Sequence, residues 1–183
     1  AGGAEESTKT GESYDIRSRD LRIKPNEGLL DPQSGQAQFG RDRDDWGNWF
    51  GCDHSMPAWH YVLDDHYLRR NPHVASPSSR VEMPRSVTYP LGAGRATGTR
   101  RVTTGNAWTS ACSVMVYRDD LFGPDFANNL FTCEPVHNLI HREVLVPNGV
   151  TFTSHRAHDE LTSEFLASTD PRFTPVSIRT GPD

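Results

Sequence analysis

Residues 110–133 read SACSVMVYRDDLFGPDFANNLFTC, and this stretch says most about the fold. Two runs rich in β-branched and aromatic residues flank a polar loop that contains Gly and Pro, which predicts an antiparallel β-hairpin. Pairing Tyr117 with Leu130 places Cys133 opposite Val114 and diagonal to Cys112. A disulfide between the two cysteines would be strained in this register, so we expect buried free thiols.

Further hairpin signals lie on both sides of this stretch. Asp15–Lys24 alternates in part and runs into the turn Pro25–Gly28, after which LLDPQSGQ returns as a second strand. VLVPNGVTF predicts another hairpin around Pro147–Gly149. Ala58–Leu63 and Val176–Thr180 are typical of short single strands.

One segment has a helical pattern. Asp159–Ser168 reads DELTSEFLAS, and Asp159 would serve as its N-cap. Elsewhere, 15 Gly and 13 Pro in 183 residues favour turns and short strands. The sequence therefore predicts an all-β fold with long loops.

Bulk composition excludes several classes of function. The net charge of −5 and the spread of Arg among Asp residues give no field that would attract nucleic acid. No run approaches 18 apolar residues, so we expect no membrane span in this chain. Residues 1–13 lack the basic and apolar regions of a signal peptide.

Aromatic and ionisable side chains are most concentrated in residues 36–72, which contain three Trp and three His beside a run of Asp and Arg. Asp44 and Asp45 followed by Trp46, Asn48 and Trp49 could line a sugar site, because carboxylates accept hydrogen bonds from hydroxyls and indole faces pack on sugar C–H surfaces. The alternative is structural: Asp45 caps a turn, and the tryptophans seal neighbouring sheets.

A second motif, HNLIH, places His137 and His141 four residues apart. On a helix they would share one face, but on a strand they would stand roughly 13 Å apart, too far to share a metal. Cys133 or Glu134 would have to be the third ligand, and neither fits a zinc spacing. We therefore favour solvated or hydrogen-bonded histidines at one end of the propeller and expect no metal.

Seven segments together resemble one family. They are DIRSRDLRIKPNEG, SGQAQFGRDRDDWGNWFG, WHYVLDDHYLRRNP, SACSVMVYRDDLFGP, CEPVHNLIHREVL, EFLASTD and SIRTGPD. They are similar to the β-propeller domain of membrane-bound dehydrogenases of planctomycetes and related bacteria, which are often fused to a cytochrome. The resemblance implies that residues 1–183 are a single incomplete β-propeller domain of about three blades, truncated at both ends.

The same resemblance implies an oxidoreductase-like propeller that acts on a sugar or alcohol and passes electrons to a haem domain outside this chain. It also implies an extracytoplasmic, periplasmic location. More distantly, the propeller is similar to soluble quinoprotein aldose and sorbosone dehydrogenases, which use pyrroloquinoline quinone and calcium. Their arginine signature would fall on Gly35–Phe39, which reads GQAQF, and their calcium loop near Gly51–Pro57.

Two functions from different classes stay open. One is the oxidoreductase, with the rest of the propeller and a cytochrome domain as partners. The other is a non-catalytic propeller that binds glycan or protein, which the lack of Arg in Gly35–Phe39 favours. No catalytic residue is assigned. We expect Asp45, Trp46, Asn48, His54 and His137 to converge at one end of the propeller. The candidate residues for binding a small molecule or glycan are Gln38, Arg41, Asp45, Trp46, Asn48, His54, His137, Asn138 and His141.

Overall fold

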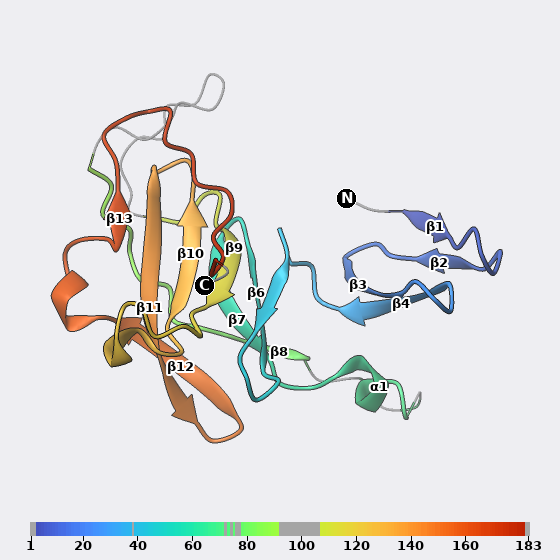
Figure 1. Ribbon diagram of the computed structural model, residues 1–183. Coiled ribbons are helices and arrows are strands. Elements are labelled where there is room, and N and C mark those ends of the chain that lie inside the picture. The colour runs from blue at the N-terminus through green and yellow to red at the C-terminus, as the bar shows by residue number, and fades with distance from the viewer. Residues whose placement is uncertain are drawn as a thin grey trace. The chain divides into compact units, whose positions relative to one another are not determined.

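The computed structural model describes residues 3–37, 39–71, 73, 75, 78–91 and 107–181. The chain forms two compact units. Unit 1 comprises Ala1–Ala37 and Leu63–Arg80, and unit 2 comprises Gln38–Val62 and Val81–Asp183. The all-β, partial-propeller expectation is confirmed, since both units are built from antiparallel sheets (Figure 1).

Unit 1 consists of two small hairpins and one helical turn. Its elements are β1 (Ala4–Glu6), β2 (Ser13–Asp15), β3 (Arg19–Lys24), β4 (Leu29–Ser34) and α1 (Asp65–Leu68). The hairpin predicted around Pro25–Gly28 is confirmed, with Lys24 paired to Leu29. Strands β1 and β2 lie in the polar segment before it, where the sequence shows no strand pattern.

Unit 2 is built from two up-and-down sheets. The first has the order β5-β6-β7-β8, and the second has the order β12-β11-β10-β9 with β13 added to β11. Four strands in sequential order is the arrangement of a propeller blade. The bounds are β5 (Arg41–Arg43), β6 (Trp49–Asp53), β7 (Met56–Tyr61), β8 (Arg80–Glu82), β9 (Cys112–Val116), β10 (Leu130–Glu134), β11 (Leu139–Asn148), β12 (Thr151–Arg156) and β13 (Leu166–Ala167).

The hairpin of residues 110–133 forms, but its predicted register is wrong by one residue. Leu130 pairs with Val116 instead of Tyr117, and Cys133 lies directly opposite Cys112. The ladder is irregular between Phe131 and Cys133, and Ser113 has φ 54. An extra residue in β9 at this bulge shifts the pairing, which alternation alone does not reveal. Among the described residues all three cysteines are buried free thiols.

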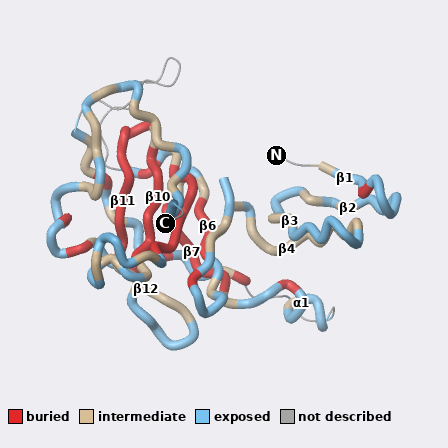
Figure 2. Tube along the Cα trace, in the orientation of Figure 1, coloured by how far each residue is buried: buried red, intermediate tan, exposed pale blue. Residues whose placement is uncertain are grey.

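The core of unit 2 lies on both faces of the β9–β12 sheet. One face packs against the β5–β8 sheet through Phe50, Cys52, Val114 and Val116. The opposite face is covered by the loops that carry Phe126, Phe165 and Ile178. Figure 2 shows the buried segments gathered in β6, β7, β10 and β11.

Two other expected elements differ from the structure. Asp159–Ser168 is not a helix: a short 3-10 turn at His158–Glu160 leads into turns and then β13. Tertiary contacts override its helical propensity, because Glu160 and Glu164 bind buried arginines of the neighbouring strands. Val176–Thr180 is an irregular segment beside β9, where Ile178 N donates to the Ser113 hydroxyl (3.2 Å).

Candidate functional site

The Asp44–Asn48 turn before β6 holds an exposed indole on a rigid base. Asp44 is buried, and its Oδ1 accepts the backbone N–H groups of Trp46 (3.0 Å) and Asn48 (2.8 Å). Its Oδ2 accepts Asn48 Nδ2 at 2.6 Å. Gly47 adopts φ 89, which a residue with a side chain would resist. Asp44, not Asp45 as the structural alternative had it, caps this turn, and Trp46 remains 74% exposed.

A groove opens beside this turn, with a volume of about 530 Å³. We call it the Trp46 groove. The Asp44–Asn48 turn forms one side, and the β11–β12 hairpin and the loop before β10 form the rest. It is lined by Asp44, Trp46, Asn48, Ala127, Asn128, Leu145, Pro147, Gly149, Val150, Thr151 and Phe152. Its size is that of small-ligand sites, which span roughly 300–1,000 Å³.

Side-chain contacts hold the β11–β12 hairpin against the β5–β8 sheet. His60 is buried, and its Nδ1 lies 3.0 Å from Thr151 Oγ1. Burial lowers the pKa of His60, so the ring is neutral at physiological pH. Phe152 packs edge-on against His60, with ring centroids 5.1 Å apart. Its ring is tilted against that of Phe50, with centroids 5.5 Å apart. The groove therefore has two preformed walls.

The five residues expected to converge do not do so. Trp46 and Asn48 precede β6, whereas His54 follows it, so roughly 17 Å of strand separates the two groups. His54 lies at the far end, where its carbonyl accepts Ala111 N. His137 belongs to that end as well, because it follows Cys133, the partner of Cys112. The expectation failed because the sequence pattern did not reveal β6, which runs between the Asp44–Asn48 turn and His54.

The HNLIH motif is neither a helix nor a single strand, the two geometries considered for it. His137 and Asn138 lie in the β10–β11 turn, and His141 lies within β11. His137 Nδ1 is 3.0 Å from the Thr88 hydroxyl, and Asn138 donates to Asp170 O (2.7 Å). Both side chains hold loops in place.

The acid suggested as a third metal ligand is also engaged. The Glu134 carboxylate accepts the Thr109 N–H, the Thr109 hydroxyl and the N–H groups of Ser110 and Val136. Across the described residues, no group of three or more His, Cys, Asp or Glu side chains is arranged to hold a metal ion.

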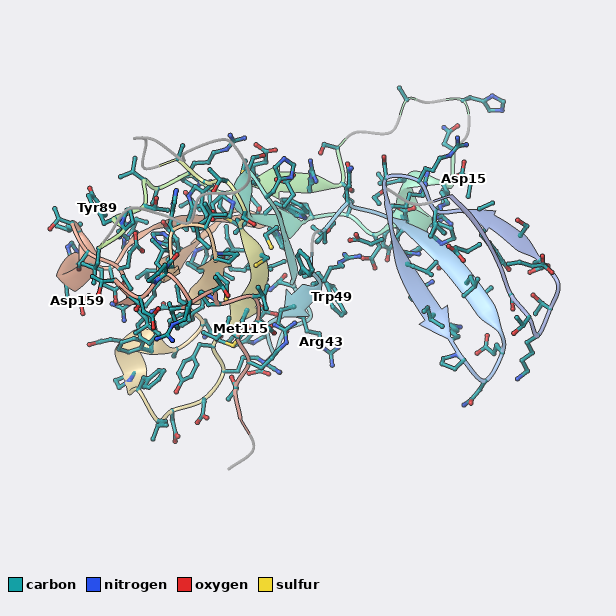
Figure 3. The ribbon with its side chains drawn as sticks, turned by 90° about the horizontal axis from the view of Figure 1, so that it is seen from above. Asp15, Arg43, Trp49, Tyr89, Met115 and Asp159 are labelled. Atoms are coloured by element: carbon teal, nitrogen blue, oxygen red, sulfur yellow. The ribbon has the colours of Figure 1, made fainter. Side chains whose placement is uncertain are left out.

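His141 is the centre of a buried ionic chain. Its Nδ1 donates to Glu164 Oε2 at 2.6 Å, and its Nε2 donates to Glu143 Oε1 at 2.8 Å. Arg156 donates to the other Glu164 oxygen at 2.7 Å and packs over the Tyr89 ring at 4.7 Å. Figure 3 labels Tyr89 and Asp159 at the end of unit 2 where this ionic chain lies.

The protonation states follow from opposing effects. Burial alone would lower the pKa of His141, but its hydrogen bonds to Glu143 and Glu164 outweigh burial and raise it. Burial would raise the pKa of both glutamates, and the bonds from His141 lower it instead. Because each ring nitrogen of His141 lies within hydrogen-bond distance of a carboxylate, the geometry suits an imidazolium between two carboxylates.

The remaining candidate residues have separate positions. Arg41 in β5 stacks on Tyr61 (3.7 Å from the ring centroid), and Arg43 and Trp49 lie side by side at the same edge of unit 2 (Figure 3). Asp45 is exposed and accepts Arg118 Nη1 at 2.9 Å. Gln38 lies outside the described residues.

The segments that correspond to a calcium loop and a quinone arginine do not fit those groups. Within Gly51–Pro57, Asp53 Oδ1 accepts the N–H and hydroxyl of Ser55 and the N–H of Met56. That carboxylate oxygen caps its own hairpin turn. Gly35–Phe39 supplies no cationic side chain. We therefore derive no chemistry through calcium or quinone.

Sequence reasoning missed Glu143, Glu164 and Arg156. Their signal was weak, because they are distributed over the 22 residues 143–164 among ordinary surface-type charges. Only the alternation HREV in β11, which puts Glu143 on the same face as His141, marks one of them in advance.

The fold and the groove define an all-β protein with a groove of small-ligand size on loops at one end of two blade-like sheets. The chain belongs to the family described as a domain of unknown function (DUF7133), whose profile matches residues 1–183. No curated protein and no solved structure matches the chain. Within the described residues, no helix has the length and apolar character needed to cross a membrane.

Proposed function

We propose that this chain is a carbohydrate-binding module and that the Trp46 groove is its glycan site. The single observation that carries the proposal is the indole of Trp46, which is 74% exposed on a turn held by three hydrogen bonds to Asp44. A large aromatic ring kept in solvent on a rigid turn forgoes the stabilisation that burial would provide. A ligand with a flat apolar face recovers it.

The lining of the groove matches a sugar ring. Trp46 and Val150, which is 84% exposed, offer apolar surface to C–H groups, while Asn48, Asn128 and Thr151 offer amides and a hydroxyl. Side chains in the groove are neutral apart from Asp44, whose oxygens are occupied by the turn. We therefore expect a neutral glycan.

The oxidoreductase activity inferred from the resemblance stays a prediction, as do the cytochrome partner and the periplasmic location. In such an enzyme the Trp46 groove would hold the sugar substrate. The observations on the groove favour binding, since they concern recognition and identify no residue positioned for electron or hydride transfer.

Calorimetric titration of the chain with cellohexaose, xylohexaose and mannohexaose tests the proposal. At least one should bind, and Trp46→Ala should weaken that binding at least about tenfold, which is about 1.4 kcal/mol. Trp46→Phe should keep most of the affinity, because a smaller aromatic face remains.

Tyr67→Ala is the matched control. Tyr67 is also an exposed aromatic residue, but it lies in unit 1. Its loss should leave binding unchanged. Absence of binding to all three sugars, or equal loss in the Trp46 and Tyr67 variants, would contradict the assignment of the groove.

A further inference from the structure

A second cavity lies at the opposite end of β6 from the Trp46 groove. It has a volume of about 340 Å³ and is lined by Ser55, Arg85, Ser86, Val87, Ala107 and Trp108. We call it the Trp108 pocket. Ser55 stands in the β6–β7 turn next to His54, which places the pocket at the end of unit 2 where His137 and His141 lie.

The wall of this pocket is rigid. Trp108 is buried and donates its indole N–H to Ser86 O at 2.8 Å. Arg156 binds the Val87 carbonyl, and Glu164 accepts Tyr89 N at 2.7 Å. The segment of residues 86–89 is thus tied to the ionic chain of His141 by its own backbone.

The ionic chain of His141 packs against the protein side of that wall. The Trp108 ring meets the His141 ring edge-on, with centroids 5.2 Å apart. The hydroxyls of Ser86 and Ser154 both lie close enough to the Glu143 carboxylate to lower its pKa. Trp108 and Ser86, which line the pocket, therefore lie beside His141 and Glu143, the two central members of the ionic chain.

One carboxylate oxygen of Glu143 makes no hydrogen bond within the ionic chain of His141. Oε1 accepts the His141 N–H, whereas Oε2 is buried and has no partner at hydrogen-bonding geometry among the described residues. A buried, ionised carboxylate oxygen without a donor is costly, and two nearby hydroxyls can satisfy it: that of Ser86, which lines the pocket, and that of Ser154, which does not. A serine hydroxyl that gives its proton to a carboxylate presents only its lone pairs to the pocket.

The pocket also contains a cationic group. Arg85 lines it and is exposed, and in the described part of the chain its one ion pair is a distant one with Glu82 (3.7 Å). A guanidinium recognises a carboxylate through paired N–H groups. The two polar features, an acceptor at Ser86 and a cation at Arg85, call for a ligand with a hydroxyl donor and an anionic group.

We propose that the Trp108 pocket binds a small polyhydroxy carboxylate, a sugar acid. Its carboxylate pairs with Arg85, its hydroxyl donates to Ser86 Oγ while Ser86 donates to Glu143 Oε2, and its carbon chain packs on Trp108. This site lies apart from the Trp46 groove and takes a different ligand class from the neutral glycan assigned to it.

Titration of the chain with D-gluconate, followed by calorimetry and by NMR, tests this proposal. D-Glucitol keeps the hydroxyls without the carboxylate, and hexanoate keeps a carboxylate without hydroxyls. Gluconate should bind at least about tenfold more tightly than either. Equal binding of gluconate and hexanoate would mean a nonspecific anion effect and would overturn the proposal, as would no gluconate binding up to about 10 mM.

Point variants locate the site. Arg85→Gln and Ser86→Ala should each weaken gluconate binding at least about fivefold. Arg172→Gln, which removes an exposed arginine elsewhere in unit 2, is the matched control and should have no effect. Both pocket residues are at least partly exposed, so the variants should fold, and near-UV circular dichroism checks this. Unchanged binding in both pocket variants would refute the assignment.

A last variant separates this site from the proposed function. Trp46→Ala should weaken hexasaccharide binding at least about tenfold and leave gluconate binding intact. If gluconate binding is lost together with glycan binding, one groove serves both ligands and the Trp108 pocket is not a separate site. Loss of glycan binding alone leaves the pocket proposal standing.

Discussion

Units 1 and 2 contain the same kind of secondary structure, but each is stabilised by a different kind of interaction. Every apolar side chain that is buried among the described residues belongs to unit 2. In unit 1 the buried residues are polar: Ser7, Asp65 and Ser79. Asp65 alone accepts Ser34 N at 2.6 Å and binds Arg19 and Arg69. Antiparallel hairpins without an apolar face are marginal, so unit 1 depends on polar contacts where unit 2 depends on its core.

Removing a core ring should show the largest effect. Phe131 in β10 is buried and packs edge-on against Phe165, with ring centroids 4.9 Å apart. Phe131→Ala should lower the free energy of unfolding of unit 2 by about 4 kcal/mol, and Phe131→Leu by much less. Chemical denaturation monitored by tryptophan fluorescence measures both. A loss below about 1 kcal/mol would mean that unit 2 is not core-stabilised as described.

Breaking the buried ionic chain should come next. Glu164→Gln leaves the His141 imidazolium and Arg156 without a shared carboxylate, at a cost of about 3 kcal/mol. Arg172→Gln, which breaks an exposed pair at 3.0 Å, should cost less than about 1 kcal/mol. Thermal unfolding of the two variants gives the comparison, and equal losses would show that the buried chain has no special weight.

The same chain should give unit 2 a pH optimum. The raised pKa of His141 contributes stability that is complete below the unfolded value of 6.5 and is lost as pH rises through the folded value. The lowered pKa values of Glu143 and Glu164 contribute stability that is complete above 4.5 and is lost as pH falls through their folded values. Unfolding followed across pH should therefore show greatest stability between about 4.5 and 6.5, and His141→Gln should remove the decline on the alkaline side.

Unit 1 should respond to the loss of one carboxylate. Burial would raise the pKa of Asp65, but its bonds to Ser34 and Arg69 lower it, so its contribution is present above 3.8 and is lost as pH falls. Asp65→Asn should cost about 2 kcal/mol locally. Hydrogen exchange should then speed up in residues 19–34 and 63–71 while β10 and β11 keep their protection. Equal acceleration in both units would show that they unfold together.

Removing the Trp46 side chain should change the free energy of unfolding least. Trp46 is 74% exposed, so Trp46→Ala should alter the free energy of unfolding by less than about 0.5 kcal/mol. Denaturation of this variant beside Phe131→Ala separates a ring kept for binding from a ring kept for packing. A loss above about 2 kcal/mol would place Trp46 with the core and weaken the glycan proposal.

The sequence by itself determined the all-β class and the hairpins at Pro25–Gly28 and Pro147–Gly149, because turn residues and alternating apolar positions act locally. It placed Trp46 and Asn48 in a common loop, and the structure keeps them together in one groove.

Only the tertiary structure decided the rest. The bulge at Ser113, the partners of His141 and the loss of the helix at Asp159–Ser168 all depend on contacts between segments far apart in the chain. Local propensity is worth a few tenths of a kcal/mol per residue, whereas a buried carboxylate that must find a cation is worth several. Where the two compete, as at Glu160 and Glu164, the long-range partner prevails, and no local pattern in the sequence announces it.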